Sequence, residues 1–544
     1  MMNGGKNMKK NFSIVFSLLL VLSLTLLGCS GSQETGKEES GEKKEEAAEG
    51  GTMVYARGGD AVKLDPATIT DGESLIVSEQ VLETLVKYEK ETPDILPGLA
   101  KDWEVSDDGK TYTFELEEGI KFHDGTDFNA DAVVKNFERW MNGKDEAEFP
   151  YFVSQFGGFK GDEAAVIKEV KAVDDHKVEI NLFRPQAPFL KNLAMTPFAI
   201  SSPAAIEKFG AKYIENPVGT GPFKFESWKR NDTITVVKNE DYWREGLPKL
   251  DKVIFKVITD NSARLNALVK GEVDLIDGLN PSDVEKVKAD SNLQIFERPS
   301  MNVGYLGFNV EKEPFDNKKV RQAISHAINK QAIIDNFYEG TAEPAKNPIP
   351  PSIDGYNDEI EDYEFDLDKA KELLDEAGFK DGFKMDLWAM PVPRPYMPNG
   401  QKVAEAIQAD LEKIGVEVNI VTMEWGTYLE KVRVGESPMF MLGWTGDNGD
   451  ADNFLYALLD KDSIGSNNYS RYANEDVHKL LIEAQTETDE EKRSELYKEA
   501  LEIIHDDAPW VPLAHTVPQL AGKNTIEGFF PHPTGVQVFE DVSM

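Results

Sequence analysis

Two charged side chains lie in segments whose composition suits ligand binding. Asp447 belongs to the turn Thr445-Gly446-Asp447-Asn448-Gly449-Asp450, which directly follows the short apolar run Met439–Trp444. Arg394 belongs to a second segment, in which four prolines between positions 391 and 398 restrict the backbone. An arginine and an aspartate held on stiff loops suit a ligand that carries opposite charges at its two ends.

Both side chains also have structural explanations. Aspartate is favoured in turns because its carboxylate bonds to nearby backbone N–H groups. Arg394 and Asp447 could instead pair with each other, and structural ion pairs resemble binding sites in sequence. The residues alone leave these alternatives open.

Other reactive side chains do not form catalytic or metal-binding patterns. No H-E-x-x-H or G-x-S-x-G motif is present, and His123 lacks partners at metal-ligand spacing. Asp447, Asp450 and Asp452 superficially resemble a calcium loop, but the bidentate glutamate twelve positions on is missing. We therefore expect neither an enzyme nor a metal site.

The single cysteine, Cys29, ends an N-terminal targeting segment. Three lysines precede an apolar run at 12–27 that is too short for an ordinary membrane-spanning helix. The sequence Leu26-Leu27-Gly28-Cys29 resembles a bacterial lipobox, which implies cleavage before Cys29 and a diacylglycerol on its sulfur. The alternative is an ordinary signal peptide with a chance cysteine. We expect residues 1–28 to be the signal peptide and 29–51, which lack large apolar residues, a disordered tether.

The segments around the two charged loops read as alternating strands and helices. Strands are expected at Lys384–Trp388, Val416–Val421 and Met439–Trp444, with helices at Gln401–Ile414 and Tyr428–Arg433 between them. This order implies parallel strands with right-handed crossovers. Both charged loops then leave one edge of the sheet, where ligands bind in open α/β sheets. Asn453 is expected to cap a helix at Phe454–Leu459.

The rest of the chain is long enough for two or more domains at 544 residues. Its N-terminal half predicts a strand at Met53–Tyr55, a helix at Leu75–Tyr88, a hairpin around Asp108-Gly109 and a βαβ unit over 252–276. The net charge of −39 argues against nucleic acid or an acidic membrane surface as a partner.

Longer segments resemble a known family. From about residue 53 to 543 the chain resembles the family 5 extracellular solute-binding proteins, receptors of bacterial peptide ABC importers. The segments that carry the resemblance are WEVSDDGKTYTFELEEGIKFHDG (103–125), NPVGTGPF (216–223), NVGYLGFNV (302–310), LWAMPVPRPYMPN (387–399), EWGTYL (424–429) and GWTGDNGDADNF (443–454).

The resemblance implies an α/β, two-lobed periplasmic-binding-protein-like fold. Mixed sheets flanked by helices are expected in each lobe, with an extra subdomain in the first lobe and a two-stranded hinge. The implied limits are 52–305 plus 516–544 for the first lobe, about 86–215 for its subdomain and 306–515 for the second lobe. The hinge is expected near Gly304–Leu306 and Leu513–Thr516.

The resemblance also implies roles for single residues. In dipeptide-binding members an arginine pairs with the peptide carboxylate and an aspartate with its α-amino group; the matching positions are Arg394 and Asp447. The other expected ligand-binding residues are Tyr396, Trp425, Trp444, Gly446, Ser466 and Asn467.

The implied function is that of a substrate-binding lipoprotein. A monomer anchored through Cys29 to the outer face of the bacterial cell membrane would capture dipeptides or short peptides and deliver them to the permease and ATPase subunits. The alternative is the same fold binding oligopeptides, glutathione, haem or a metal chelate. No catalytic residue, cofactor or nucleic-acid partner is expected.

Overall fold

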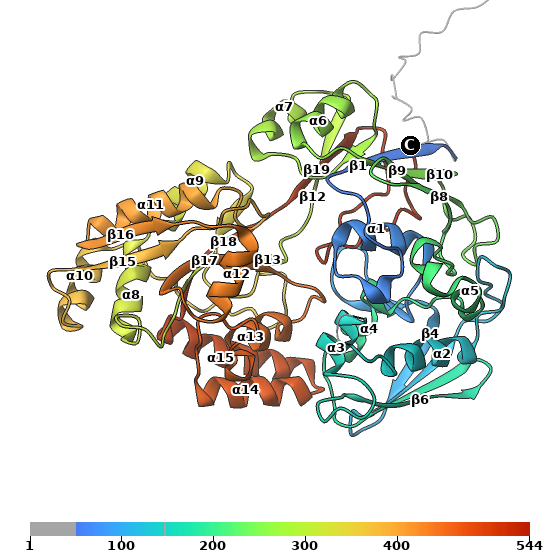
Figure 1. Ribbon diagram of the computed structural model, residues 1–544, viewed down its shortest axis with the longest axis horizontal. Helices are drawn as coiled ribbons and strands as arrows, with labels where there is room; N and C mark the ends of the chain where they lie inside the picture. The colour runs from blue at the N-terminus through green and yellow to red at the C-terminus, as the bar shows by residue number, and fades with distance from the viewer. Residues whose placement is uncertain (1–49, 146–147) are drawn as a thin grey trace, which may run out of the picture. The chain divides into compact units, whose positions relative to one another are not determined.

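The computed structural model describes residues 50–145 and 148–544, so the signal peptide, Cys29 and nearly all of the tether lie outside the described residues. Within them the chain forms two lobes, each built on its own large sheet (Figure 1). No helix in the described ranges is long and apolar enough to cross a membrane.

The first lobe is built on a seven-stranded mixed sheet. Its strands, in spatial order, are β12 (Leu293–Glu297), β19 (Gln519–Lys523), β11 (Leu275–Ile276), β1 (Thr52–Arg57), β10 (Lys252–Val257), β9 (Thr233–Lys238) and β8 (Phe223–Lys229). The expected βαβ unit is confirmed, but β1 lies between its two strands and is parallel to both.

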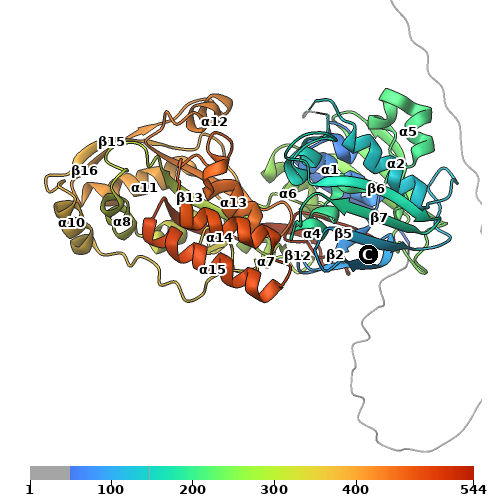
Figure 2. The same ribbon diagram turned by 90° about the horizontal axis from the view of Figure 1, so that it is seen from below.

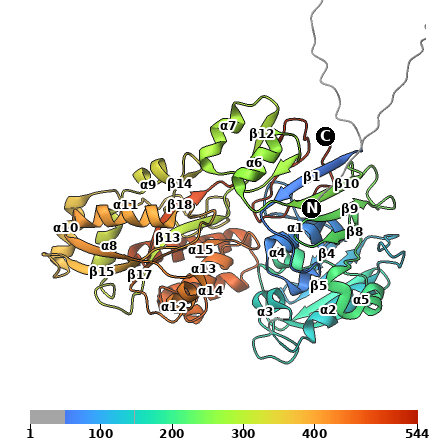
Figure 3. The ribbon, with the colours of Figure 1, turned by 45° about the horizontal axis from the view of Figure 1, so that its top comes forward.

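Both faces of this sheet are covered. On one face α6 (Asn261–Val269) and α7 (Val284–Lys288) pack against Ala56 and Ile276; Figure 3 shows both helices beside β12. On the other face α1 (Gly72–Val81) and the C-terminal residues 526–542 pack against Tyr55 and Phe255. The C-terminal segment is therefore part of the first lobe's core.

A smaller unit is inserted between β1 and β8. Its antiparallel sheet has the order β4 (Ala100–Val105), β5 (Thr111–Leu116), β7 (Lys177–Leu182) and β6 (Ile167–Asp174), and a hairpin pairs β2 (Val86–Tyr88) with β3 (Ile95–Pro97). Figure 2 shows this sheet beside α2. The helices here are α2 (Ala130–Met141), α3 (Pro150–Phe156), α4 (Phe189–Leu193) and α5 (Pro203–Phe209).

The helix expected at Leu75–Tyr88 is only partly correct. The helix ends at Val81, and Val86–Tyr88 instead forms β2. After α1 the chain pairs with a later segment instead: β2 pairs with β3, and a Cβ at Gly98 would lie 2.6 Å from the Thr84 carbonyl oxygen. The hydrophobic periodicity of residues 75–88 does not predict such a contact, because it depends on a segment elsewhere in the chain.

The second lobe is built on a six-stranded sheet. Its order is β14 (Ala342–Pro344), β18 (Trp510–Thr516), β13 (Asn302–Phe308), β17 (Met439–Thr445), β15 (Phe383–Trp388) and β16 (Val416–Val421). β15 pairs in parallel with both β16 and β17, which confirms the three-strand arrangement expected from the sequence. Alternate residues of β13 face opposite sides, as the pleat requires.

Helices cover both faces of this second sheet (Figure 1). One face carries α8 (Lys318–Ala327), α9 (Lys330–Phe337), α10 (Leu367–Glu376) and α11 (Gly400–Glu412). The other carries α12 (Trp425–Arg433), α13 (Asp452–Leu459), α14 (Glu475–Thr486) and α15 (Glu490–Asp507).

The chain passes between the two large sheets through two short connections. They are residues 298–301, between β12 and β13, and residues 517–518, between β18 and β19. The segments expected to form the hinge lie beside these connections but inside β13 and β18, where Gly304 pairs with Ala514. His515 of β18 is fully buried there, and its Nδ1–H donates to the Asn302 carbonyl at 2.8 Å.

Burial gives His515 a predictable effect on stability. Burial lowers the pKa of His515 to about 4, so between pH 6.5 and 4 the unfolded chain binds the proton and the folded chain does not. Stability should therefore fall as the pH falls through this window, by about 2 kcal/mol from pH 7 to pH 5 for this group.

Denaturant-induced unfolding of wild type and His515→Asn at pH 7 and pH 5 measures this effect. Asparagine keeps a donor near the Nδ1 position and cannot be protonated. The wild type should lose about 2 kcal/mol more than the variant over this pH range. Equal losses in the two proteins would show that His515 does not contribute to acid sensitivity.

Candidate functional site

Asp447 lies in the turn that follows β17, as the sequence predicts. Its carboxylate accepts two hydrogen bonds: Asn453 Nδ2 donates to Oδ2 at 3.3 Å, and the Tyr151 hydroxyl donates to Oδ1 at 3.2 Å. Partial burial raises the pKa of Asp447, and these two donors act in the opposite direction. The carboxylate is thus partly desolvated and is bonded only to neutral donors. A nearby positive charge would therefore stabilise its charged form.

Asn453 holds the Asp447 turn in place. Its side-chain oxygen accepts from the Asp447 backbone N–H at 3.0 Å and from Trp444 Nε1 at 3.1 Å. The expected helix cap at Asn453 is therefore wrong: α13 starts at Asp452, with Ala451 at the cap position and no side-chain cap bond. The amide is used to orient Asp447 instead.

Tyr151 comes from the first lobe, on α3. It lies 296 positions before Asp447, so no local sequence signal identifies it. Its hydroxyl contact shows that the Asp447 turn of the second lobe faces a polar group of the first lobe. The pKa of Tyr151 is raised well above its usual range by burial and by the Asp447 charge, so it stays a neutral donor.

Arg394 is exposed and lies over an aromatic stack. Its guanidinium carbon is 5.4 Å from the centre of the Trp425 ring, and Trp425 stacks on Tyr428 with centroids 5.6 Å apart. A cation–π contact orients the guanidinium without using its N–H donors. In the described part of the chain no ion pair joins Arg394 to Asp447, so that structural alternative does not describe this arrangement.

A tight turn positions the Arg394 loop against the sheet. The backbone groups of Arg394 and Met397 bond to each other in both directions, at 3.1 and 2.9 Å. The Tyr338 hydroxyl donates to the Tyr396 carbonyl at 3.1 Å, and the buried Tyr396 ring covers Gly443 of β17. The loops carrying Arg394 and Asp447 are thereby fixed to neighbouring parallel strands.

The remaining predicted residues divide into two groups. Trp425, Trp444 and Gly446 lie beside the charged loops; Gly446 is buried, its N–H donates to the Met301 carbonyl at 2.8 Å, and a Cβ there would meet the Phe454 ring. Ser466 and Asn467 lie in a separate turn, where the Ser466 N–H donates to the Ser463 carbonyl. In the described residues no hydrogen bond joins that turn to Asp447.

Metal-ligand geometry occurs elsewhere. Among the described residues, Asp460, Asp462 and His478 have ligand atoms within 4.8 Å of one another. His478 Nδ1 already lies 2.9 Å from Asp460 Oδ2, and Asp460 Oδ1 accepts the Asp462 N–H at 2.9 Å. These contacts explain the group as an ion pair between the buried Asp460, at the end of α13, and the half-buried His478 of α14. His123 is also structural, with Nε2–H donating to the Gly221 carbonyl at 2.9 Å.

Residues 94–466 match the family described as bacterial extracellular solute-binding proteins, family 5. The chain belongs to this family. The match covers most of both lobes, including β17 and the loop that carries Arg394.

Individual relatives cover nearly the whole chain. The dipeptide-binding protein of Escherichia coli K12 is 42% identical over 91% of this chain and 94% of its own length. The heme-binding protein A of Haemophilus influenzae is 40% identical over 97% and 98%, respectively. The crystal structure of a dipeptide-binding protein from Pseudoalteromonas sp. SM9913 in complex with Met-Leu superposes with a TM-score of 0.76, at 31% identity over 91% of this chain and 100% of that one.

The packing of Tyr396 on Gly443 gives a stability prediction. A Cβ at Gly443 would lie 2.2 Å from the Tyr396 ring, so Gly443→Ala must displace the ring and should cost about 1–3 kcal/mol. Gly72→Ala is a matched control, because nothing lies within 4 Å of its Cβ position. Denaturant unfolding should separate the two variants; a Gly443→Ala protein as stable as the control would contradict the packing described.

Proposed function

We propose that the protein is the substrate-binding component of a bacterial ABC importer and captures dipeptides between its two lobes. The observation that carries the proposal is the pair of opposite charges at one sheet edge: a partly buried Asp447 carboxylate on the turn after β17 and an exposed Arg394 guanidinium on the loop after β15. The names of similar dipeptide-binding proteins support it.

The two charges suit the two ends of a peptide. The ammonium would replace or join the neutral donors on Asp447, and the planar guanidinium of Arg394 would bind the carboxylate through two parallel bonds. Such charge-assisted bonds strengthen when water is excluded. Holding both ends of the peptide selects its length. Ligand side chains that lie in water-containing pockets would contribute little to selectivity.

Closure of the lobes would provide the water exclusion. We propose that the first lobe spans 52–305 plus 516–544, with a subdomain at about 86–215, and that the second spans 306–515. The connections at 298–301 and 517–518 are short enough to act as a hinge. In this role the protein binds and delivers; it does no chemistry on the peptide.

Relatives named for heme and glutathione supply the second candidate ligands. Isothermal titration with an unmodified dipeptide, a tripeptide, glutathione and haem separates the possibilities. The proposal requires the dipeptide to bind most tightly. Tighter binding of haem or glutathione would overturn the dipeptide assignment while keeping the fold and the lobes.

The Asp447 carboxylate should be essential for recognition. Asp447→Asn keeps the size of the side chain and the bond to Asn453 but removes the charge opposite the ammonium. Removing one charge of a buried pair leaves the other charge unpaired. This costs roughly 2–5 kcal/mol, or about 30- to 4,000-fold in dipeptide affinity. Titration calorimetry of wild type and variant measures the loss.

An N-acetylated dipeptide provides the control for this substitution. It lacks the ammonium, so it should bind poorly to wild type and lose little further affinity in Asp447→Asn. If the losses from acetylation and from the substitution are additive, the amino group is held by some other residue and the assignment of Asp447 fails.

We also propose that the mature protein begins at Cys29 and is anchored by lipid to the outer face of the cell membrane. Two acyl chains on this residue are sufficient for stable anchoring. The permease and ATPase subunits would then be its partners, with the protein itself a monomer.

Cys29→Ser tests the anchor, because serine cannot form the thioether. The variant should appear in the soluble fraction after high-salt washing of membranes, while wild type stays with the membranes. A variant that remains in the membrane fraction would contradict lipid attachment at Cys29.

A further inference from the structure

The first lobe contacts four consecutive residues of the turn that carries Asp447, from Asp447 to Asp450. Beyond the Tyr151 contact, the side chain of Asn448 donates to Asn192 Oδ1 at 2.7 Å. Lys191 Nζ donates to the Gly449 carbonyl at 3.1 Å. Lys191 and Asn192 both belong to α4, so one short helix of the first lobe touches two consecutive residues of the second-lobe turn.

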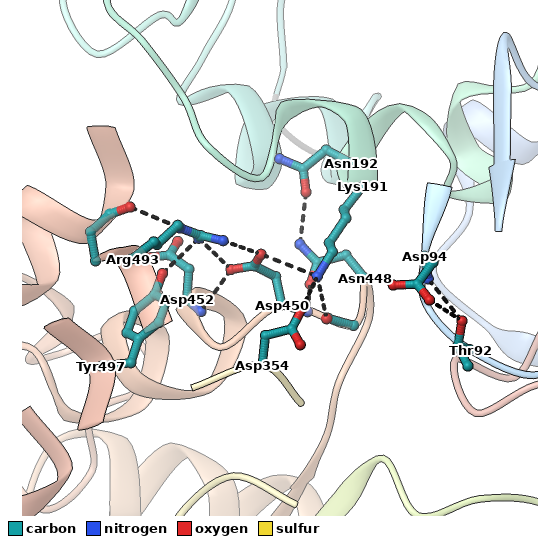
Figure 4. A network of polar contacts seen from close by, with 12 residues as sticks. Thr92, Asp94, Lys191, Asn192, Asp354, Asn448, Asp450, Asp452, Arg493 and Tyr497 are labelled. Atoms are coloured by element: carbon teal, nitrogen blue, oxygen red, sulfur yellow. Dashed lines mark hydrogen bonds and ion pairs between the residues drawn. The ribbon is translucent and has the colours of Figure 1, made fainter. Parts of the chain in front are cut away.

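The ammonium of Lys191 lies among second-lobe oxygens. Besides the Gly449 carbonyl, it is 3.5 Å from Asp354 Oδ2 and 3.8 Å from Asp450 Oδ2, and the Lys191 side chain is only 17% exposed. Figure 4 shows Lys191 reaching from α4 to Asp450 and Asp354. A single cation thus meets three acceptors across the boundary between the lobes.

The acceptor side of this contact is fixed within the second lobe. Arg493 donates to both oxygens of Asp450, at 2.7 and 2.6 Å, and also donates to the Tyr497 hydroxyl. Arg493 and Lys191 hold the pKa of the fully buried Asp450 carboxyl well below its usual range. Asp450 is therefore a permanently charged acceptor whose position does not depend on Lys191.

The donor side is fixed within the first lobe. The Tyr88 hydroxyl donates to the backbone carbonyl of Lys191 at 2.8 Å, which holds α4 without using the lysine side chain. Removing that side chain should therefore leave both lobes folded and remove only the contact between them.

We propose that Lys191 is a positioning residue for ligand capture, which stabilises the closed arrangement by binding the turn that carries Asp447. Its effect on peptides rests on the proposed function. Because the contact can form only when the lobes are together, its loss should mainly speed ligand release and leave association nearly unchanged.

Stopped-flow fluorescence with an unmodified dipeptide tests the proposal. Lys191→Met should raise the dissociation rate about tenfold or more, the range for a lost charge-assisted hydrogen bond, with the association rate within about twofold of wild type. Lys101→Met is the matched control, because Lys101 pairs with Glu118 inside the first lobe at 3.8 Å. An unchanged dissociation rate in Lys191→Met, or an equal change in the control, overturns the proposal.

Solution scattering without peptide gives a second readout that does not depend on the ligand's identity. Lys191→Glu places a negative charge beside Asp450 and Asp354, so its radius of gyration should exceed that of wild type. An unchanged radius in this variant overturns the proposal that Lys191 stabilises the closed arrangement. If wild type binds no dipeptide but the radius increases in Lys191→Glu, the proposed function fails while the role of Lys191 stands.

We expect the same thermal melting temperature for three unliganded proteins: wild type, Lys191→Met and Lys101→Met. A large drop confined to Lys191→Met would assign the residue to folding and overturn the positioning role.

Lys191→Arg provides a rescue test, because arginine keeps the charge and can reach the same oxygens; it should restore slow release.

Discussion

The charge on Asp447 is the constraint around which the site is built. A carboxylate that loses part of its water is driven toward its neutral form, and here burial does raise its pKa. Asn453 and Tyr151 supply donors to the two oxygens without neutralising them. The Asp447 carboxylate therefore has no positively charged partner among its donors, and a peptide ammonium could take that position. An arginine in the place of either donor would have formed an ion pair with Asp447 within the protein.

Asp450, three positions after Asp447, is by contrast fully paired within the protein. The guanidinium of Arg493 donates to both of its carboxylate oxygens, and its pKa lies far below the usual range. Two aspartates of one turn thus have opposite electrostatic environments. The paired one fixes the turn to α15, and the unpaired one faces the first lobe. This division leaves the turn fixed to the second lobe through Asp450 while the Asp447 carboxylate has no cationic partner in the described residues.

Much of this arrangement can be predicted from the sequence, for definable reasons. The strand expected at Val416–Val421 has the bounds of β16, and the strand expected at Met439–Trp444 differs from β17 by one residue, because apolar or alternating runs end abruptly at turn residues. Parallel pairing then places the Arg394 and Asp447 loops at one edge. The helix cap expected at Asn453 is wrong because its amide bonds to the Asp447 turn and not to a helix end. Tyr151 and Lys191 act from distant segments, which only the tertiary fold brings together.

The most direct measurement is a crystal structure of the protein with a bound unmodified dipeptide. We expect the peptide nitrogen at about 2.7–2.9 Å from an Asp447 carboxylate oxygen and the peptide carboxylate held by two bonds from Arg394. We also expect Lys191 in contact with the Asp447 turn. A dipeptide bound with its amino group away from Asp447, or with its carboxylate away from Arg394, would show that these two residues do not hold the ends of the ligand.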